Sequence, residues 1–205
     1  VNTRGRLISG LVTTVVALAG FVTAGALPAA AAPSTVDYVA LGDSYAAGTA
    51  LRDGTTCLQS DLGYPQQLSD SESRIDLTAN VACSGATISK VASEQLSALK
   101  RHTRLVTLTV GAANLGLSTV LTACTTGTQA QCQAAILLAQ GLLGDCADDE
   151  NSLYRSLTAL YTQVAGKAPG TRIVVTGYPL LFDSAAPESP QAAINDATAE
   201  LNCII

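Results

Sequence analysis

Four short apolar runs alternate with helix-like segments along this chain, and this alternation restricts the fold more than any other feature of the sequence. The runs cover residues 36–41, 75–82, 105–110 and 172–176. The helix-like segments cover 86–100, 129–143 and 150–167, and a further one, 189–205, begins with a cap serine and a proline in its first turn. Nearly continuous apolar strands that alternate with helices are typical of a parallel sheet covered on both faces. We therefore predict an α/β fold.

The first 32 residues differ in composition from the rest. Arg4 and Arg6 precede a mostly apolar run over 7–27, which is followed by a tract of small residues, 28–33. This order is typical of a secretory signal peptide. An uncleaved membrane anchor is the alternative, because the run approaches the roughly 20 residues that a spanning helix needs. Since small residues dominate the run, we expect cleavage near Ala32, a single secreted domain over 33–205, and no stable membrane span.

Six cysteines follow this segment. They are Cys57, Cys83, Cys124, Cys132, Cys146 and Cys203. An even count behind an export signal predicts three disulfides, because the outside of the cell is oxidising. The residues alone leave the pairing open, although Cys124 with Cys132 is the most local choice.

Charge and ligand chemistry exclude two classes of partner. The formal net charge is -5, with only 11 Lys and Arg residues, so the chain cannot build the basic face that nucleic acids require. The cysteines show no C-x-x-C spacing and the one histidine has no partner ligand. We therefore expect neither a nucleic-acid partner nor a metal or other cofactor.

An unusual turn follows each strand-like run. The turns are GDSYAAG at 42–48, ACSGAT at 82–87, GAANLG at 111–116 and GYP at 177–179. Parallel sheets place their ligand sites beyond the carboxyl ends of the strands. A serine directly after a strand presents its Oγ at this edge, where backbone N–H groups can stabilise an oxyanion. Ser44 is therefore either a nucleophile for acyl transfer or only a turn serine that caps the next helix.

The four turns, in this order, resemble the sequence blocks of the GDSL, or SGNH, serine hydrolases, and in particular the secreted actinobacterial lipases and esterases of that family. DYVALGDSYAAG resembles the nucleophile block, ACSGAT the glycine block, VGAANLG the G-x-N-D block, and IVVTGYP the strand and turn that follow. The resemblance extends from Val36 to about Asn202. It implies a three-layer α/β/α sandwich of the SGNH-hydrolase or flavodoxin-like type.

The same resemblance implies a function and a site. Ser44 would be the nucleophile, and the backbone N–H groups of Ser44 and Gly85 would be oxyanion donors. The substrates would be carboxylic esters of lipids or short acyl chains. We expect the chain to be a monomer. In this family, disulfides hold the loops around the active site, and the resemblance therefore implies the disulfides Cys57–Cys83 and Cys124–Cys132. It leaves Cys146 and Cys203 for each other, unless the partner of one lies beyond Ile205.

The G-x-N-D block departs from the family pattern. An ungapped reading of 111–114 puts Ala113 where the family has its oxyanion asparagine, and Asn114 where it usually has aspartate. Asn114 supplies the amide only if the register shifts by one residue. Loss of one oxyanion donor typically costs about 10²–10³ in kcat.

The general base is the second departure. The family carries a D-x-x-H block after a further strand, and we expect this sequence to stop before that block and strand. The only histidine, His102, precedes the 105–110 run, so it should lie at the opposite end of the sheet from Ser44. A six-residue strand spans roughly 20 Å, whereas a serine–histidine hydrogen bond needs about 3 Å. The activity of this chain is thus open, and a non-catalytic secreted binding domain on a hydrolase scaffold is the alternative function.

Three further features allow two interpretations each. Asp43 either orients the turn at Ser44 or simply accepts from nearby backbone N–H groups. The acidic cluster at 145–150 could bind Ca²⁺, but acidic residues before a helix ordinarily favour its N-terminal dipole. The apolar residues of 115–121 form either an acyl pocket or, as we prefer, part of the core.

Overall fold

The structure is a computed structural model that describes residues 35–49, 56–146, 148, 150–183 and 186–205. The expected signal peptide, its cleavage site and the predicted boundary at residue 33 lie outside the described residues. Within the described ranges, no helix combines the length and the apolarity needed to cross a bilayer.

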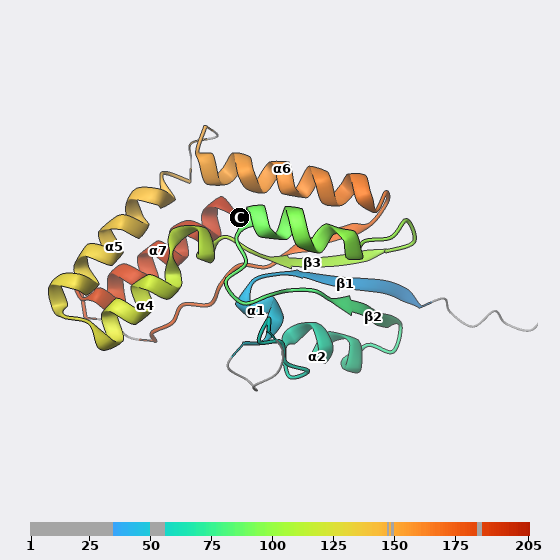
Figure 1. Cartoon of the computed structure of the whole chain (residues 1–205), viewed down its shortest axis with the longest axis horizontal. Coiled ribbons are helices and arrows are strands. Elements are labelled where there is room, and N and C mark those ends of the chain that lie inside the picture. Colours follow the sequence, from blue (N-terminus) through green and yellow to red (C-terminus); the bar gives the residue numbers. More distant parts are fainter. Residues whose placement is uncertain (1–34, 50–55, 147, 149, 184–185) are drawn as a thin grey trace, which may run out of the picture. The chain divides into compact units, whose positions relative to one another are not determined.

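A four-stranded sheet with the order β2-β1-β3-β4 forms the centre of the fold, and all its strand pairs are parallel (Figure 1). The strands are β1 (Val36–Gly42), β2 (Ile75–Asn80), β3 (Leu105–Thr109) and β4 (Arg172–Val175). These are the four apolar runs, each within two residues of its predicted ends, so the predicted α/β fold with a parallel sheet is confirmed.

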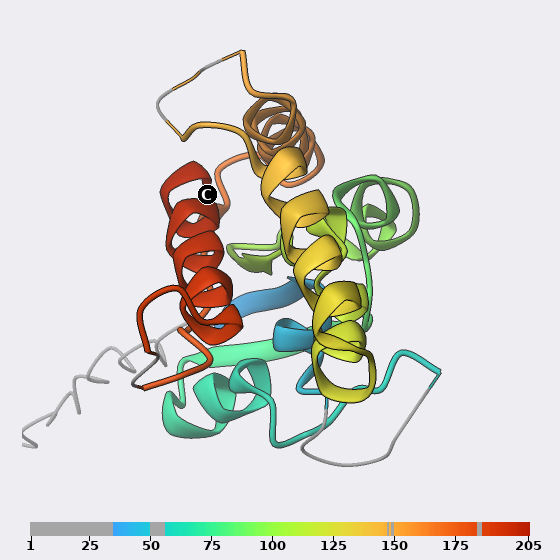
Figure 2. The same cartoon turned by 90° about the vertical axis from the view of Figure 1, so that its left-hand side faces the viewer.

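Helices cover the two faces of this sheet and one end of it. The α-helices are α1 (Ser44–Ala47), α2 (Tyr64–Ser71), α3 (Ile88–Lys90), α4 (Leu117–Thr126), α5 (Gln129–Leu143), α6 (Ser152–Lys167) and α7 (Pro190–Ile204). Helix α2 lies on one face, and α3 and α6 lie on the other, so the fold has three layers (Figure 1). Helices α4, α5 and α7 gather beyond the carboxyl ends of the strands, where α5 and α7 lie side by side (Figures 1 and 2).

Burial differs between the central and the edge strands. Residues 38–42 of β1 and 106–109 of β3 are buried on both faces, whereas β2 and β4 alternate between more and less exposed positions. The expected sheet with helices on both faces is confirmed, and its covering is complete over the central pair and partial at the edge strands. The main core lies between the sheet and α6, where Leu157, Leu160 and Val164 are almost fully buried.

Local sequence signals explain where the longer helices begin. Thr128 and Gln131 form a reciprocal capping box at the start of α5. The side chain of Asn151 accepts from the first backbone N–H groups of α6. Ser189 caps α7, and Pro190 occupies its first turn. The predicted helices over 129–143, 150–167 and 189–205 are confirmed within two residues at each end.

The predicted continuous helix over 86–100 is wrong. After α3 the chain forms a π-helical turn, η1 (Val91–Gln95), and then a 3₁₀ turn, η2 (Leu96–Ala98). The π turn carries the buried side chain of Gln95, which hydrogen-bonds to the backbone of Gly42. π-helical turns often lie at functional sites, and this one holds the end of β1.

Three disulfides fix the segments around the carboxyl ends of the strands. Cys57 pairs with Cys83, Cys124 with Cys132, and Cys146 with Cys203. The second pair joins α4 to α5, and the third joins the loop after α5 to α7. These are the three pairs that the family resemblance implied.

Candidate active site

Backbone hydrogen bonds gather three of the four turns at one edge of the sheet. The N–H of Asp43 donates to the carbonyl of Thr109 at 2.8 Å, and the N–H of Cys83 donates to the carbonyl of Gly42 at 3.0 Å. The turns that follow β1, β2 and β3 are therefore neighbours, as the parallel sheet predicts.

Gly42, the last residue of β1, allows the close approach of the chain to β3 at this edge. Its φ is 132°, and a Cβ at this position would lie 2.1 Å from the carbonyl oxygen of Thr109. The Gln95 side chain accepts from the Gly42 N–H at 2.8 Å and donates to its carbonyl at 2.9 Å. Only glycine fits here, and Gln95 fixes the direction in which the chain leaves β1.

Ser44 is the first residue of α1 and does not cap it. Asp43 is the cap, because its Oδ1 accepts from the Tyr45 N–H at 3.1 Å. Ser44 is partly exposed, and its Oγ makes no hydrogen bond with any of the described residues. The interpretation of Ser44 as a capping serine is therefore wrong.

Gly85 lies in the turn after β2 with its backbone exposed. Its φ is 75°, and a Cβ there would meet nothing within 4 Å. Within the described part of the chain, its N–H donates to no acceptor, whereas the flanking Ser84 and Ala86 N–H groups donate to Cys57 and Cys83 carbonyls. The Gly85 N–H is thus free to bind a ligand.

Asn114 lies in the 3₁₀ turn η3 (Ala112–Leu115), and its side chain points toward α3. Its Oδ1 accepts from the Ile88 N–H at 3.0 Å. This bond ties the turn after β3 to the start of α3, a structural role that suits the aspartate position of the block. It favours the ungapped reading, in which Ala113 stands at the asparagine position.

The carboxyl group of Asp43 is buried and shared by two donors. Besides the Tyr45 N–H, it accepts from the hydroxyl of Tyr178, which in turn accepts from the Ala112 N–H at 3.2 Å. Burial raises the pKa of Asp43 to about 6, although both hydrogen bonds oppose this shift. Burial, together with the nearby Asp43, also raises the pKa of Tyr178. Asp43 thus both orients the turn and accepts from its backbone, which unites the two interpretations.

Asn202 of α7 holds Tyr178 in place. Its Oδ1 accepts from the Tyr178 N–H, and its Nδ2 donates to the Tyr178 carbonyl, both at 2.8 Å. A Cβ on Gly177 would lie 2.6 Å from this amide. Sequence reasoning missed Gln95 and Asn202, and it singled out the turn that contains Tyr178 without giving this tyrosine a role. No local pattern distinguishes the two amides, because their partners are distant in the sequence.

An apolar pocket of about 530 Å³, counted out to its open mouth, lies next to this network. Tyr45, Ala112 and Tyr178 line one side of it, and side chains of η3, α4, α5 and α7 line the rest. Leu115 and Val120 belong both to the pocket wall and to the buried core. The preferred interpretation of 115–121 as core is confirmed for these two residues, which also line the pocket.

His102 lies where the sequence placed it, on the surface at the amino ends of the strands. Its Nε2 is 3.5 Å from Oδ2 of Asp37, near the start of β1, and its side chain is 72% exposed. No imidazole of the described residues is near Ser44.

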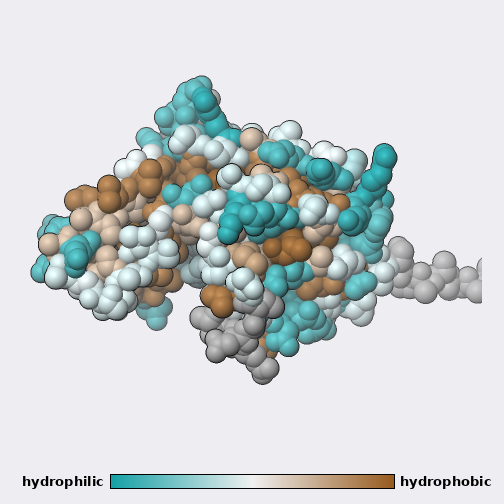
Figure 3. Space-filling view, viewed as in Figure 1, coloured by the Kyte–Doolittle hydropathy of each residue, from teal (hydrophilic) through white to brown (hydrophobic). Residues whose placement is uncertain are grey.

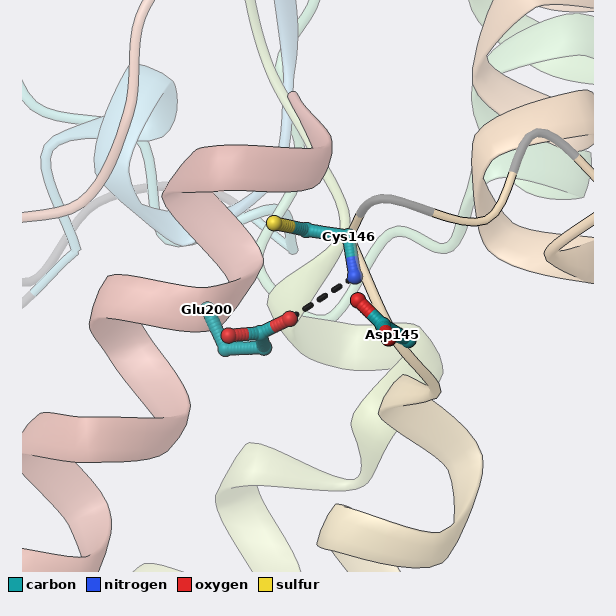
Figure 4. Close-up of side chains that lie close together, drawn as sticks. All are labelled: Asp145, Cys146 and Glu200. Atoms are coloured by element: carbon teal, nitrogen blue, oxygen red, sulfur yellow. Dashed lines mark hydrogen bonds between the residues drawn. The ribbon is translucent and has the colours of Figure 1, made fainter.

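The Ca²⁺ interpretation of the acidic cluster at 145–150 is not tested as a whole, because Asp149 lies outside the described residues. Asp145, Cys146 and Glu200 lie together (Figure 4), but the sulfur of Cys146 is in the disulfide with Cys203. Glu200 accepts from the Cys146 N–H at 2.8 Å. The cluster thus links the loop after α5 to α7, and the adjacent helix α6 is capped by Asn151 rather than by an acidic residue.

A sequence profile of the GDSL-like lipase/acylhydrolase family matches residues 40–205, which include all four turns. The chain belongs to this family. Lipase 1 of Streptomyces coelicolor is 31% identical over 214 aligned positions, which cover 98% of this chain and 76% of that protein.

Two solved structures of GDSL-type relatives share the fold. Phospholipase A1 from Streptomyces albidoflavus superposes with a TM-score of 0.72 at 32% identity, over 83% of this chain and 74% of that one. The extracellular lipase of Streptomyces rimosus gives a TM-score of 0.69 at 29% identity over the same shares. This chain therefore shares its α/β architecture with these two Streptomyces enzymes.

Proposed function

We propose that this chain is a secreted hydrolase of carboxylic esters, with Ser44 as its nucleophile. The observation that carries the proposal is the free Oγ of Ser44 on a turn whose capping is done by Asp43. A serine held at the edge of a sheet, with its hydroxyl unused by the fold, suits attack on an acyl carbon. Gly42 and Gln95 hold the turn, so the position of the serine is fixed before substrate binds.

Two backbone donors support the developing oxyanion. The N–H groups of Ser44 and Gly85 donate to no described residue, and they lie at neighbouring strand exits. Donors that are in place before reaction stabilise a tetrahedral intermediate without reorganisation. Ala113 adds no amide, so we expect this oxyanion site to be weaker than one with three donors.

The substrate class follows from the pocket and the relatives. Because the pocket is lined almost wholly by apolar side chains, it suits an acyl chain of a lipid or a short ester. The relatives are named lipase and phospholipase A1. Three disulfides and the extracellular lipase of S. rimosus support secretion, with cleavage near Ala32 and a mature domain from residue 33.

The described residues place no imidazole beside Ser44. His102 lies at the other end of the sheet and cannot take the proton of this serine. Asp43, although its pKa is about 6, is engaged by Tyr178 and Tyr45 and is not free to act as the base.

Hydrolysis of p-nitrophenyl butyrate by the purified chain tests this function. We expect a rate that Ser44→Ala abolishes and that Ser84→Ala, at a neighbouring serine of the same edge, leaves unchanged. Equal rates for the chain and for Ser44→Ala would contradict the proposal.

A non-catalytic binding domain is the second candidate. Ala113 favours it, because the side-chain amide of the family's oxyanion position then has no counterpart in the turn after β3. In that case the chain would bind a fluorescent fatty acid in the apolar pocket, with the same affinity in Ser44→Ala, and would show no serine-dependent turnover.

A further inference from the structure

The outward side of α5 carries a cluster of leucines that no other described element covers. Leu137, Leu138 and Leu142 are 63%, 72% and 58% exposed. Leu138 and Leu142 are four residues apart and so share one face of the helix. Figure 3 shows hydrophobic surface gathered along this helix. Single exposed leucines are ordinary, but a contiguous group marks an interaction site.

Helices α4 and α5 carry no charged side chain around this leucine cluster, and Glu188 is the charged residue that lines a pocket together with Leu137. From Leu105 to Gly144 the sequence contains no Asp, Glu, Lys, Arg or His, and this stretch includes all of α4 and α5. Charged groups resist transfer to an apolar medium because their hydration is lost. A surface without them can be removed from water at little cost.

The leucine cluster is continuous with the pocket beside Tyr178. Ile136 and Ala139, on the inner side of α5, line that pocket. Leu181 also lines it and is 37% exposed, and the adjacent Leu180 is 56% exposed. Helix α5 therefore carries the leucine cluster on its outer side and a wall of the pocket on its inner side, and the exposed Leu181 belongs to the pocket wall as well.

We propose that this leucine cluster docks the protein on a neutral or zwitterionic lipid surface, from which acyl chains enter the pocket. The proposal rests on the proposed ester-hydrolase function for the choice of lipid. Apolar side chains on one helix face partition into the interface between headgroups and acyl chains. The formal net charge of -5 disfavours anionic lipid, which would repel the chain.

A second copy of the chain fits this surface less well. A stable protein interface buries about 800 Å² on each partner, with roughly 20–30 residues a side. The exposed leucines of α5 and of 180–181 are far fewer, and two copies would also bring like net charges together. The proposal therefore commits to lipid.

Cosedimentation with sucrose-loaded phosphatidylcholine vesicles tests the docking. The triple variant Leu137→Gln, Leu138→Gln, Leu142→Gln keeps good helix formers in α5. We expect it to lower the partition coefficient at least tenfold, whereas Val174→Thr, which changes an exposed apolar residue of β4, leaves it unchanged. Ser44→Ala should bind the vesicles like the parent chain, so docking is measured independently of turnover.

Three results would overturn the proposal. The parent chain could fail to sediment with vesicles, or the triple variant could sediment equally well. Light scattering could show a dimer of the parent chain that the triple variant dissolves, which would assign the leucine cluster to a second copy. Cooperative thermal unfolding checks that the triple variant is folded; if it is not, Leu138→Gln alone must weaken sedimentation at least threefold.

Discussion

The hydroxyl of Tyr178 donates a hydrogen bond to Oδ2 of Asp43, 135 residues away in the sequence, at 2.5 Å. This contact joins the turn after β4 to the turn that carries Ser44. The same hydroxyl accepts from Ala112 after β3, so one side chain links three of the four strand exits.

Removing this hydroxyl should destabilise the fold. Tyr178→Phe leaves a buried carboxylate oxygen and the Ala112 N–H without their partner, and an unsatisfied buried group costs about 1–3 kcal/mol. We expect a loss of this size in the free energy of unfolding, measured by urea titration at pH 8. Tyr45→Phe is the matched control: its ring packs edge-on against Tyr178, but its hydroxyl bonds to no described residue, so a loss below about 0.5 kcal/mol is expected.

Burial of Asp43 predicts a pH dependence of stability. Its folded pKa, about 6, lies above the unfolded value of 3.8, so the folded state binds the proton more tightly. The contribution of Asp43 is therefore fully present below pH 3.8 and is lost as the pH rises to about 6.

Asp43→Asn removes the charge but leaves one acceptor oxygen for two donors, the Tyr45 N–H and the Tyr178 hydroxyl. This loss is the same at every pH, so the free energy of unfolding of Asp43→Asn, relative to that of the parent chain, should rise by about 2–3 kcal/mol between pH 4 and pH 8, since one pKa unit is worth about 1.4 kcal/mol. Urea midpoints of both proteins across this range measure the difference. A constant difference from pH 4 to pH 8 would show that Asp43 is not desolvated.

Two glycine substitutions separate a steric clash from backbone strain. Gly42→Ala places a Cβ 2.1 Å from a carbonyl oxygen, and we expect no folded protein from it. In Gly85→Ala the new Cβ meets no atom within 4 Å. The positive φ at this position should still lower the free energy of unfolding by about 1–2 kcal/mol. Thermal unfolding of both variants distinguishes the two cases, and a stable Gly42→Ala protein would contradict the geometry at the end of β1.

The sequence predicted the strands and the longer helices well because local signals define them. The four apolar runs, the capping serine before Pro190 and the pattern of α6 need no tertiary information. The short helix α2 and helix α4 were missed, since α2 has weak apolar periodicity and α4 reads equally well as buried loop. The π turn at Gln95 depends on a partner 53 residues away, which no local pattern reveals.

The candidate site was predicted in part for the same reason. Ser44 and Gly85 stand in recognisable turns, and the structure places both at the edge that parallel topology indicates. Tyr178 and Asn202 act through contacts between distant segments. Their roles depend on the packing of α7 on the turn after β4, which the sequence does not reveal. The role of Asn114 likewise depends on its bond to Ile88.

Ala113 offers a gain-of-function prediction. Ala113→Asn restores an amide at the family's oxyanion position, and one such donor is worth about 10²–10³ in kcat. We expect at least a tenfold increase in serine-dependent turnover of p-nitrophenyl butyrate, with little change in KM. Asn114→Ala is the contrasting variant: it should lower thermal stability by removing the bond to Ile88. If Asn114→Ala alone abolished turnover while Ala113→Asn had no effect, the shifted register would be correct.

Chemical rescue by imidazole tests most directly whether Ser44 acts as a nucleophile, because His102 lies too far away to take its proton. The measurement is the rate of p-nitrophenyl butyrate hydrolysis at increasing imidazole concentration, for the chain and for Ser44→Ala. The slope for Ser44→Ala gives the rate at which imidazole attacks the ester without help from Ser44. We expect a steeper slope for the chain, because imidazole can take the proton of the Ser44 hydroxyl, which His102 cannot reach. Identical slopes for the two proteins would contradict this expectation.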